Sequence, residues 1–199
     1  PTESLNLGRG FVLKNRTLLA AMTNKQSHED GTLSSEEIDW LTRRAKGDFA
    51  ITTTAAANVT EFGRGWEGEM GVWGDHQLPG LTKMATQLNS AGTVSLVQLF
   101  HGGMRAPRAI NGVRPVSASE NTESGMNGEF THAMSSEEVS EMIQFFTKAA
   151  IRCEQAGFHG VELHGAHSYL ICQFLGKKTN RRTDKWGGDI AGRSRFLLE

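Results

Sequence analysis

The sequence predicts an α/β fold built as a (β/α) TIM-type barrel, of which this chain holds about the first four βα units behind an N-terminal hairpin. Four apolar, strand-like runs alternate with segments of helical periodicity, which is typical of a parallel sheet with right-handed crossovers. No glycine-rich dinucleotide fingerprint follows the first strand, so a Rossmann fold is disfavoured. Eight units need roughly 250 residues, whereas the chain has 199 and stops in its presumed fourth helix at Leu198-Glu199. We therefore expect residues 1–199 to form a single domain, the N-terminal half of a barrel.

Composition and charge disfavour some classes of binding partner. The formal net charge of −1 gives no electrostatic reason to expect nucleic acid or an anionic membrane as a partner. No apolar run approaches the length needed to cross a membrane. The two cysteines, Cys153 and Cys172, fit a reduced protein better than a disulfide framework, so we expect a cytoplasmic location.

The first half of the chain is expected to hold a hairpin, two strands and a helix. Gly8 and Gly10 lie between apolar residues and favour a hairpin. A serine cap followed by early acidic residues begins a helix that Gly47 ends. The expected bounds are Leu5–Leu13 for the hairpin, Arg16–Ala21 and Phe49–Thr54 for two buried strands, a helix opening at Ser34, and a loop over Ala55–His76.

The second half is expected to hold two further strands and two helices. Apolar residues at helical spacing indicate a helix over Leu78–Ser90, and Ser135–Glu138 is a capping box that starts a long helix through Cys153. The expected strands are Val94–Leu99 and Gly160–His164, and a long polar loop should run from His101 to Met134, mobile between Gly112 and Gly128.

The end of the fourth strand carries an unusual concentration of polar groups. His164, His167 and Tyr169 fall within six residues at a strand-to-loop junction, where α/β enzymes build their sites. Alternation along the strand places Glu162 and His164 on one face. Either histidine alone would more often be a structural hydrogen-bonder. The three groups together favour a functional site, and with Glu162 as the nearby carboxylate a metal site is the weaker interpretation.

The segment from this junction to the end of the chain resembles a known family. The runs HGAHSYLICQFL, TNRRTDKWGG and RSRF occur in the order and spacing found in the old yellow enzyme family of flavin-dependent ene-reductases. The resemblance covers the whole chain. Gly176-Lys177 stands in place of Ser-Pro, Trp186 in place of Tyr and Ala191-Gly192 in place of Glu-Asn. The loop is expected to be held, without contact to substrate, by four retained residues: Asn180, Arg182, Thr183 and Asp184.

The resemblance implies an FMN cofactor and assigns residues near it. Thr23 would hydrogen-bond near the flavin O4, and the carboxamide of Gln98 would pair with the pyrimidine edge, because it is a donor and an acceptor at once. Lys25 stands where many members have a substrate-facing tyrosine, and Met104-Arg105 shifts an expected basic residue by one position. The cofactor-binding residues implied in this way are Ala21, Met22, Thr23, Ala55 and Gln98.

The same resemblance implies a reaction on a small-molecule substrate. NADH or NADPH would supply a hydride through the flavin to the β-carbon of an activated alkene, an α,β-unsaturated carbonyl or nitro compound. His164 and His167 would bind the substrate oxygen, where negative charge accumulates. Tyr169 would give a proton to the α-carbon, since a free phenol, with a pKa of roughly 10, is protonated at neutral pH.

Three alternatives stay open at this point. The family binds the flavin phosphate with its last two barrel strands, so this chain is expected to need a missing C-terminal half-barrel or to form a homo-oligomer. It could instead be a truncated or non-catalytic half-barrel that self-associates and binds FMN weakly or not at all. The third alternative is a metal-dependent barrel lyase that uses His164, His167 and Glu162.

Overall fold

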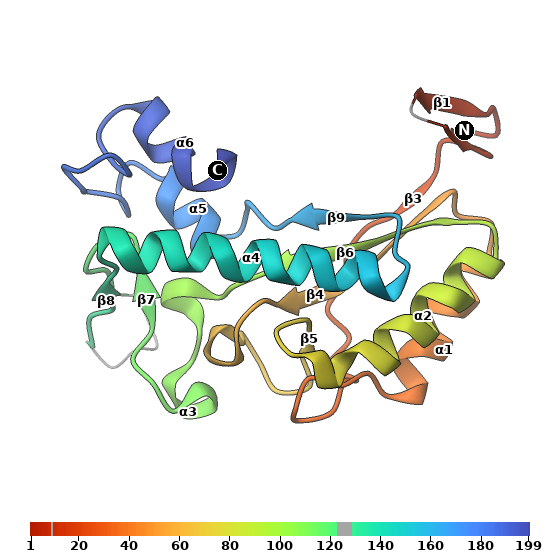
Figure 1. Cartoon of the computed structure of the whole chain (residues 1–199), viewed down its shortest axis with the longest axis horizontal. Helices are drawn as coiled ribbons and strands as arrows, with labels where there is room; N and C mark the ends of the chain where they lie inside the picture. The colour runs from red at the N-terminus through yellow and green to blue at the C-terminus, as the bar shows by residue number, and fades with distance from the viewer. Residues whose placement is uncertain (9, 123–128) are drawn as a thin grey trace.

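The computed structural model describes residues 1–8, 10–122 and 129–199, and its centre is a parallel sheet (Figure 1). Four strands lie in the order β3-β4-β6-β9, all parallel, and each is followed in the chain by helical structure. This order confirms the prediction of successive βα units with strands neighbouring in chain order. The bounds are β3 Leu18–Leu19, β4 Ile51–Asn58, β6 Val94–Phe100 and β9 Gly160–Leu163.

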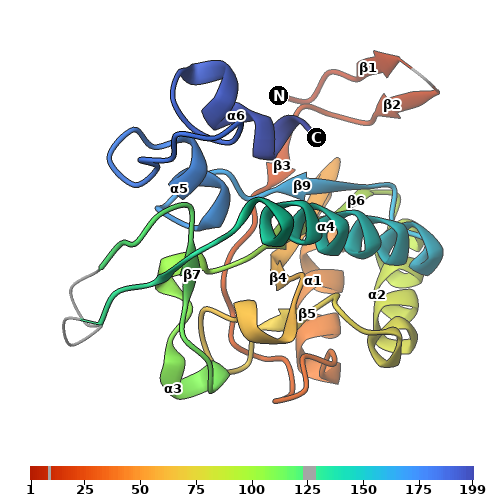
Figure 2. The ribbon, with the colours of Figure 1, turned by 60° about the vertical axis from the view of Figure 1, so that its left-hand side comes forward.

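Helices cover one face of this sheet. Figures 1 and 2 both show α4 lying alongside β6 and β9, with α1 and α2 beside β4. Outward-facing strand residues such as Val97 and Leu99 are 0% exposed against these helices. Burying side chains of this size stabilises the fold by about 1.5–3 kcal/mol each. The helices are α1 Ser35–Lys46, α2 Leu78–Ser90 and α4 Ser136–Ala156.

The opposite face of the sheet is polar and only partly buried. Successive strand residues point to opposite faces, so Gln98 faces away from the buried Val97 and Leu99. Glu162 lies in register with Gln98 on the neighbouring strand, and both are half-buried. No helix of the described chain packs over this face. It corresponds to the interior of the barrel that the sequence predicts.

Both helix-start predictions are confirmed by their caps. The Ser34 hydroxyl accepts a hydrogen bond from the Glu37 amide at 3.1 Å. Ser135 and Glu138 form the reciprocal capping box, with the Glu138 amide donating to the Ser135 hydroxyl at 3.2 Å and the Ser135 amide donating to the Glu138 carboxylate at 2.7 Å. These caps satisfy amides that a helix cannot pair internally.

The predicted hairpin is present, and a second helical group follows β9. Strands β1 (Leu5–Gly8) and β2 (Phe11–Leu13) pair antiparallel and project away from the sheet (Figure 2). At the other end of the molecule lie α5 (Leu170–Leu175), which the sequence did not predict, and α6 (Ile190–Leu198). Phe174 and Phe196 join these two helices with stacked rings 4.4 Å apart.

Two strand predictions were wrong in their bounds. The first strand is two residues long and not Arg16–Ala21, and Leu18 is 46% exposed, because this strand has a neighbour on one side only. The second strand runs to Asn58 and includes Ala55, which was expected in a loop. It extends because β6 pairs with it on one side and β5 (Met70–Gly71) on the other, and this short β5 was missed.

The long segment before α4 is more structured than expected. It contains the 3-10 turn η3 (Gly103–Arg105), a short helix α3 (Arg108–Asn111) and the paired strands β7 (Val116–Ser117) and β8 (His132–Ala133). Of the stretch predicted to be mobile, residues 123–128 lie outside the described residues.

The loop after β9 is held by three of the four residues predicted for this role: Asn180, Arg182 and Asp184. The Asn180 side-chain nitrogen donates to the carbonyls of Phe174 and Trp186, each at 2.8 Å. The Arg182 guanidinium donates to Asp184 and to the Ala118 carbonyl, at 2.9 and 3.0 Å. Its hydrogen bond is the main reason why the pKa of Asp184 is lowered to about 2.

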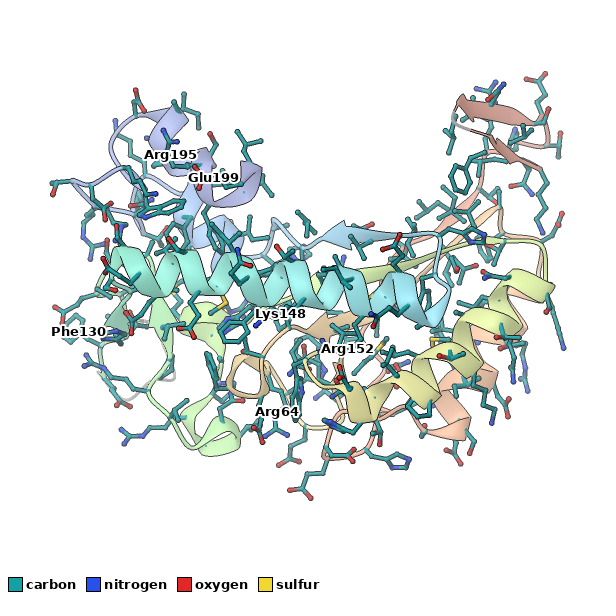
Figure 3. The ribbon with its side chains drawn as sticks, in the orientation of Figure 1. Arg64, Phe130, Lys148, Arg152, Arg195 and Glu199 are labelled. Atoms are coloured by element: carbon teal, nitrogen blue, oxygen red, sulfur yellow. The ribbon has the colours of Figure 1, made fainter. Side chains whose placement is uncertain are left out.

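A longer-range ion pair fixes α4 to the segment after β5. Arg152, labelled on α4 in Figure 3, donates to the Val72 carbonyl at 2.7 Å and to Asp75 at 2.8 Å.

Across the described residues, no helix combines the length and the apolar character needed to span a membrane.

Candidate active site

The site lies where β6 and β9 end. Gln98 and Glu162 are register partners on these neighbouring strands, and the Gln98 side-chain amide donates to the Glu162 carboxylate. One step further along, the His164 amide donates to the Leu99 carbonyl at 3.0 Å, which continues the ladder beyond the end of β9. Glu162 and His164 therefore share the open face of the sheet, as alternation predicted.

The structure brings together the three residues predicted to be catalytic. The ring centroids of His164 and His167 are 5.2 Å apart, and those of His164 and Tyr169 are 4.9 Å apart. His167 and Tyr169 are separated by 6.4 Å. All three pairs meet edge to face, an arrangement that aromatic rings prefer. The three rings thus form one cluster at the end of β9.

An aromatic wall that the sequence analysis missed supports this cluster. Phe100 is 0% exposed, and its ring lies 4.5 Å from Tyr169 and 5.6 Å from His164. Trp66 also packs against Phe100, with the ring centroids 5.3 Å apart. Phe100 follows Gln98 by two residues on β6, so period-two alternation was the signal that could have placed it on the site face.

The protonation state of His164 can be argued from its surroundings. Partial burial, and then the neighbouring His167, lower the pKa of His164, so the neutral imidazole is favoured. Its Nδ1 accepts a hydrogen bond from the Ala166 amide at 3.3 Å. A neutral imidazole that accepts at Nδ1 carries its proton on Nε2. His164 thus offers an N–H donor at Nε2.

His167 and Ser168 have an uncommon backbone conformation. Both lie in the left-handed region, with φ of 54° and 58°, which residues other than glycine rarely adopt. Such strain persists when surrounding contacts fix it. The Ser168 carbonyl accepts from the Gln173 side chain at 2.6 Å, and the Tyr169 amide donates to the Ala166 carbonyl at 3.1 Å. The turn therefore presents His167 and Tyr169 on the same side as His164.

Gln173 is the buried centre of this support, a role that no pattern in the sequence indicated. It is 1% exposed, donates to the carbonyls of Ser168 and Gly102, and accepts from the Met104 amide and the Ser117 hydroxyl. A carboxamide has two donors and two acceptor lone pairs, and here all are used. It joins the site turn to the loop that follows β6.

The residues expected to contact the flavin ring lie after β3 and on β4 and β6. Met22 and Thr23 are exposed in an extended segment beyond β3, and Ala21 is half-buried. Ala55 is 5% exposed and sits where the register of β4 against β6 shifts. Lys25, which is expected to face the substrate and not the flavin, is exposed with φ of 55°. Within the described chain, no backbone hydrogen bond joins residues 21–25 or Ala55 to the two histidines or to Tyr169.

These residues fit a flat ring with donors and acceptors along one edge. The amides of Met22, Thr23 and Lys25 donate to no backbone carbonyl in the described chain, so they are available to a ligand. Because the Gln98 amide nitrogen donates to Glu162, its oxygen is directed elsewhere as an acceptor. Ala55 adds no bulk. These donors and acceptors are of the chemical type that the pyrimidine edge of a flavin pairs with.

The structure gives no support to the metal-dependent lyase. Among the described residues, no group of three or more histidine, cysteine, aspartate and glutamate side chains could hold a metal ion. Glu162 is engaged with Gln98 and not with the histidines.

The chain is similar to known proteins along almost its whole length. The model of the NADH:flavin oxidoreductase / NADH oxidase family matches residues 3–199. The probable NADH-dependent flavin oxidoreductase YqiG of Bacillus subtilis is 38% identical over 98% of this chain, and an NADH:acrylate oxidoreductase of Vibrio harveyi is 39% identical over 95%.

Solved structures show the same likeness. A 2-naphthoyl-CoA reductase complex superposes with a TM-score of 0.94 at 32% identity over 99% of the chain, and morphinone reductase with 0.91 at 28% identity over 99%. The chain spans 52% of the Bacillus relative, 19% of the Vibrio relative, and 32% and 56% of these two structures. It corresponds to about half or less of each.

Proposed function

Because the chain belongs to the NADH:flavin oxidoreductase / NADH oxidase family, we propose that it is the N-terminal, substrate-binding half of an FMN-dependent ene-reductase. Residues 1–199 then form one domain, half of a (β/α)8 flavin-binding barrel, and the reductant is NADH or NADPH. The substrate is a small molecule with an activated alkene. The names of relatives refer to acrylate and fumarate, both alkenes conjugated to a carboxyl group.

The observation that carries the proposal is the triad of His164, His167 and Tyr169 at the end of β9. His164 offers an Nε2–H donor, because its Nδ1 is an acceptor and its pKa is lowered. Two nitrogen donors can bind one carbonyl or nitro oxygen. A donor aimed at a developing oxyanion contributes about 2.7–4 kcal/mol to transition-state stabilisation in other enzymes.

In this proposal the cofactor and the three side chains have different roles in the reaction. A bound flavin supplies the hydride chemistry that no side chain can perform. His164 and His167 hold the substrate oxygen and stabilise the negative charge that develops there. Tyr169 holds a proton on its phenol oxygen and delivers it to the α-carbon. The Phe100–Trp66 wall excludes water behind the triad, since Phe100 is fully buried.

We also propose that a second half-barrel completes the site, either a C-terminal continuation or another copy of the chain. Strand β9 pairs with β6 only, among the strands of the described chain. An apolar groove of about 260 Å³ runs between α4, β9 and α6 beside this edge, lined by residues such as Phe146 and Val161. Leu163 and Leu198 at the groove are 41% and 78% exposed. An open strand edge with apolar flanks favours association.

The second candidate function is a non-catalytic half-barrel that self-associates and binds FMN weakly or not at all. The same open edge supports it. Visible flavin absorbance of the purified chain, with its size in solution, separates the two. We expect the isolated chain to retain little or no FMN, to have negligible turnover and to run as a dimer or larger. A yellow, monomeric preparation that reduces an enone at ordinary enzyme rates would overturn this expectation.

The test of the reductase proposal needs a protein with both barrel halves. NADH or NADPH consumption with a cyclic enone should require the enone, and Tyr169→Phe should lower the rate of enone reduction by about 10²–10⁴-fold, the usual contribution of a general acid. The rate of flavin reduction by the nicotinamide should be unchanged. Full enone turnover in Tyr169→Phe would remove Tyr169 as the proton donor.

A further inference from the structure

Arg105 makes two contacts with the turn that carries the proposed catalytic groups. Its Nη1 donates to the His167 carbonyl at 2.9 Å. Its guanidinium carbon lies 5.1 Å from the centre of the Tyr169 ring, over the face. Arg105 ends the 3-10 turn η3 after β6, whereas His167 and Tyr169 follow β9. One side chain thus bridges the ends of two neighbouring strands.

The turn needs such support because of its backbone. His167 and Ser168 are consecutive left-handed residues, and neither is glycine. Each has a carbonyl that a side chain from elsewhere binds: Gln173 donates to Ser168 and Arg105 donates to His167. Gln173 is buried, but Arg105 is the exposed half of the pair. Without Arg105, the His167 carbonyl would lose this hydrogen bond, and the peptide could relax toward an ordinary conformation.

We propose that Arg105 is a positioning residue for the reaction: it holds His167 and Tyr169 in the arrangement that binds the substrate oxygen and delivers the proton. This inference rests on the proposed function. A planar guanidinium can donate in its plane while its face lies over an aromatic ring. Lysine can replace the charge but not this combination. Arg105 acts through its neighbours and is not itself placed on the substrate.

The backbone of η3 next to Arg105 is itself held by buried hydrogen bonds. Gln173 accepts from the Met104 amide at 3.1 Å and donates to the Gly102 carbonyl at 3.3 Å, so the backbone on the N-terminal side of Arg105 is fixed to the same buried amide as the site turn. Arg108 is the matched control. It is three residues further on, exposed, and paired with Glu129 at 2.6 Å, and in the described chain it makes no hydrogen bond to the turn.

The experiment uses the fact that the chain has one tyrosine, Tyr169. Labelling with 3-fluorotyrosine gives a single ¹⁹F resonance that reports on this ring in the chain itself, without flavin. In Arg105→Gln the resonance should shift and broaden or split, because the ring loses the cation and the turn gains freedom. Arg105→Lys should restore the shift only in part, and Arg108→Gln should leave the wild-type signal unchanged. An unchanged resonance in Arg105→Gln overturns the proposal.

Two further measurements separate positioning from general destabilisation and from failure of the proposed function. The urea midpoint of Arg105→Gln should stay close to wild type; a large loss there, equal in Arg105→Lys, would mean a purely structural role and contradict the proposal. In a protein with both halves, Arg105→Gln should slow enone reduction about ten- to a hundredfold, since small misplacements cost this much, and leave flavin reduction unchanged. If wild type has no enone activity, the proposed function fails, whereas the ¹⁹F result still decides whether Arg105 positions the turn.

Discussion

The two faces of the central sheet differ in what they bury. On the helix-covered face, Val97 and Leu99 are 0% exposed among apolar neighbours. On the open face, Gln98 and Glu162 are half-buried and hydrogen-bonded to each other. The two sets alternate along the same strands, so residues next to each other in sequence serve stability and chemistry separately. Substitutions at adjacent positions can therefore test the comparison directly.

The largest expected difference is between Leu99 and Gln98. Leu99→Ala should lower the free energy of unfolding by about 2–5 kcal/mol, because it removes buried methyl groups and leaves a cavity. Gln98→Ala should lower it by only about 0.5–1.5 kcal/mol, because it removes one hydrogen bond to Glu162 on a partly open face. Urea unfolding followed by tryptophan fluorescence measures both. Equal losses would mean that the open face is as important to stability as the covered face.

Two histidines allow the comparison to be tested through the pH dependence of the free energy of unfolding. Burial lowers the pKa of His101 to about 3, whereas His164 is only half-buried. Between about pH 6.5 and 3 the unfolded chain binds a proton at residue 101 that the folded chain does not, so stability should fall with falling pH by up to about 1.4 kcal/mol per pH unit. Above about pH 6.5 residue 101 is neutral in both the folded and the unfolded chain, so this loss of stability is absent.

Substitution identifies which histidine is responsible. His101→Asn removes the titrating group and keeps an acceptor for the Gly103 amide, which His101 Nδ1 now provides at 2.9 Å. It should flatten the acid slope of stability, and His164→Asn should leave most of the slope in place. The opposite ranking, measured by urea unfolding from about pH 4.5 to 7, would contradict the burial argument.

The smallest expected difference in the free energy of unfolding is between substitutions of two carboxylates. Asp184 accepts from Arg182, which lowers its pKa to about 2, but its side chain is 37% exposed, so screening reduces the benefit to about 1 kcal/mol. That contribution is complete above about pH 4 and is lost as the pH falls through about 2. Asp184→Asn should cost about 1 kcal/mol at neutral pH. Glu162→Gln, on the open face, should cost less than about 0.5 kcal/mol; thermal unfolding in parallel decides the order.

Local signals in the sequence predicted much of the fold. The bounds of α2 and the capping box at Ser135 were correct because apolar spacing and caps act over a few residues. The strand bounds were less accurate. Strand β4 continues through Ala55 because neighbours pair with it on both sides, and β5 is two residues long. Such bounds depend on pairing between segments that are distant in sequence. The periodicity of one segment carries no information about that pairing.

The sequence predicted that His164, His167 and Tyr169 lie together, but it did not predict the contacts that support them. The order of His164, His167 and Tyr169 placed them at one strand end, and the structure joins their rings. The pairing of Gln98 with Glu162 depends on the register of two strands. The left-handed turn at His167 carries no glycine to mark it, so only tertiary contacts could reveal it.

The central claim is that the donors at the end of β9 bind a substrate oxygen. Titration of a flavin-loaded protein with both barrel halves by a phenol, which mimics that oxygen, tests it most directly. His164→Ala and His167→Ala should each weaken phenol binding by about tenfold or more, since each deletes one donor to a charged oxygen, while flavin content stays normal. Unchanged phenol affinity in both variants would contradict the assignment.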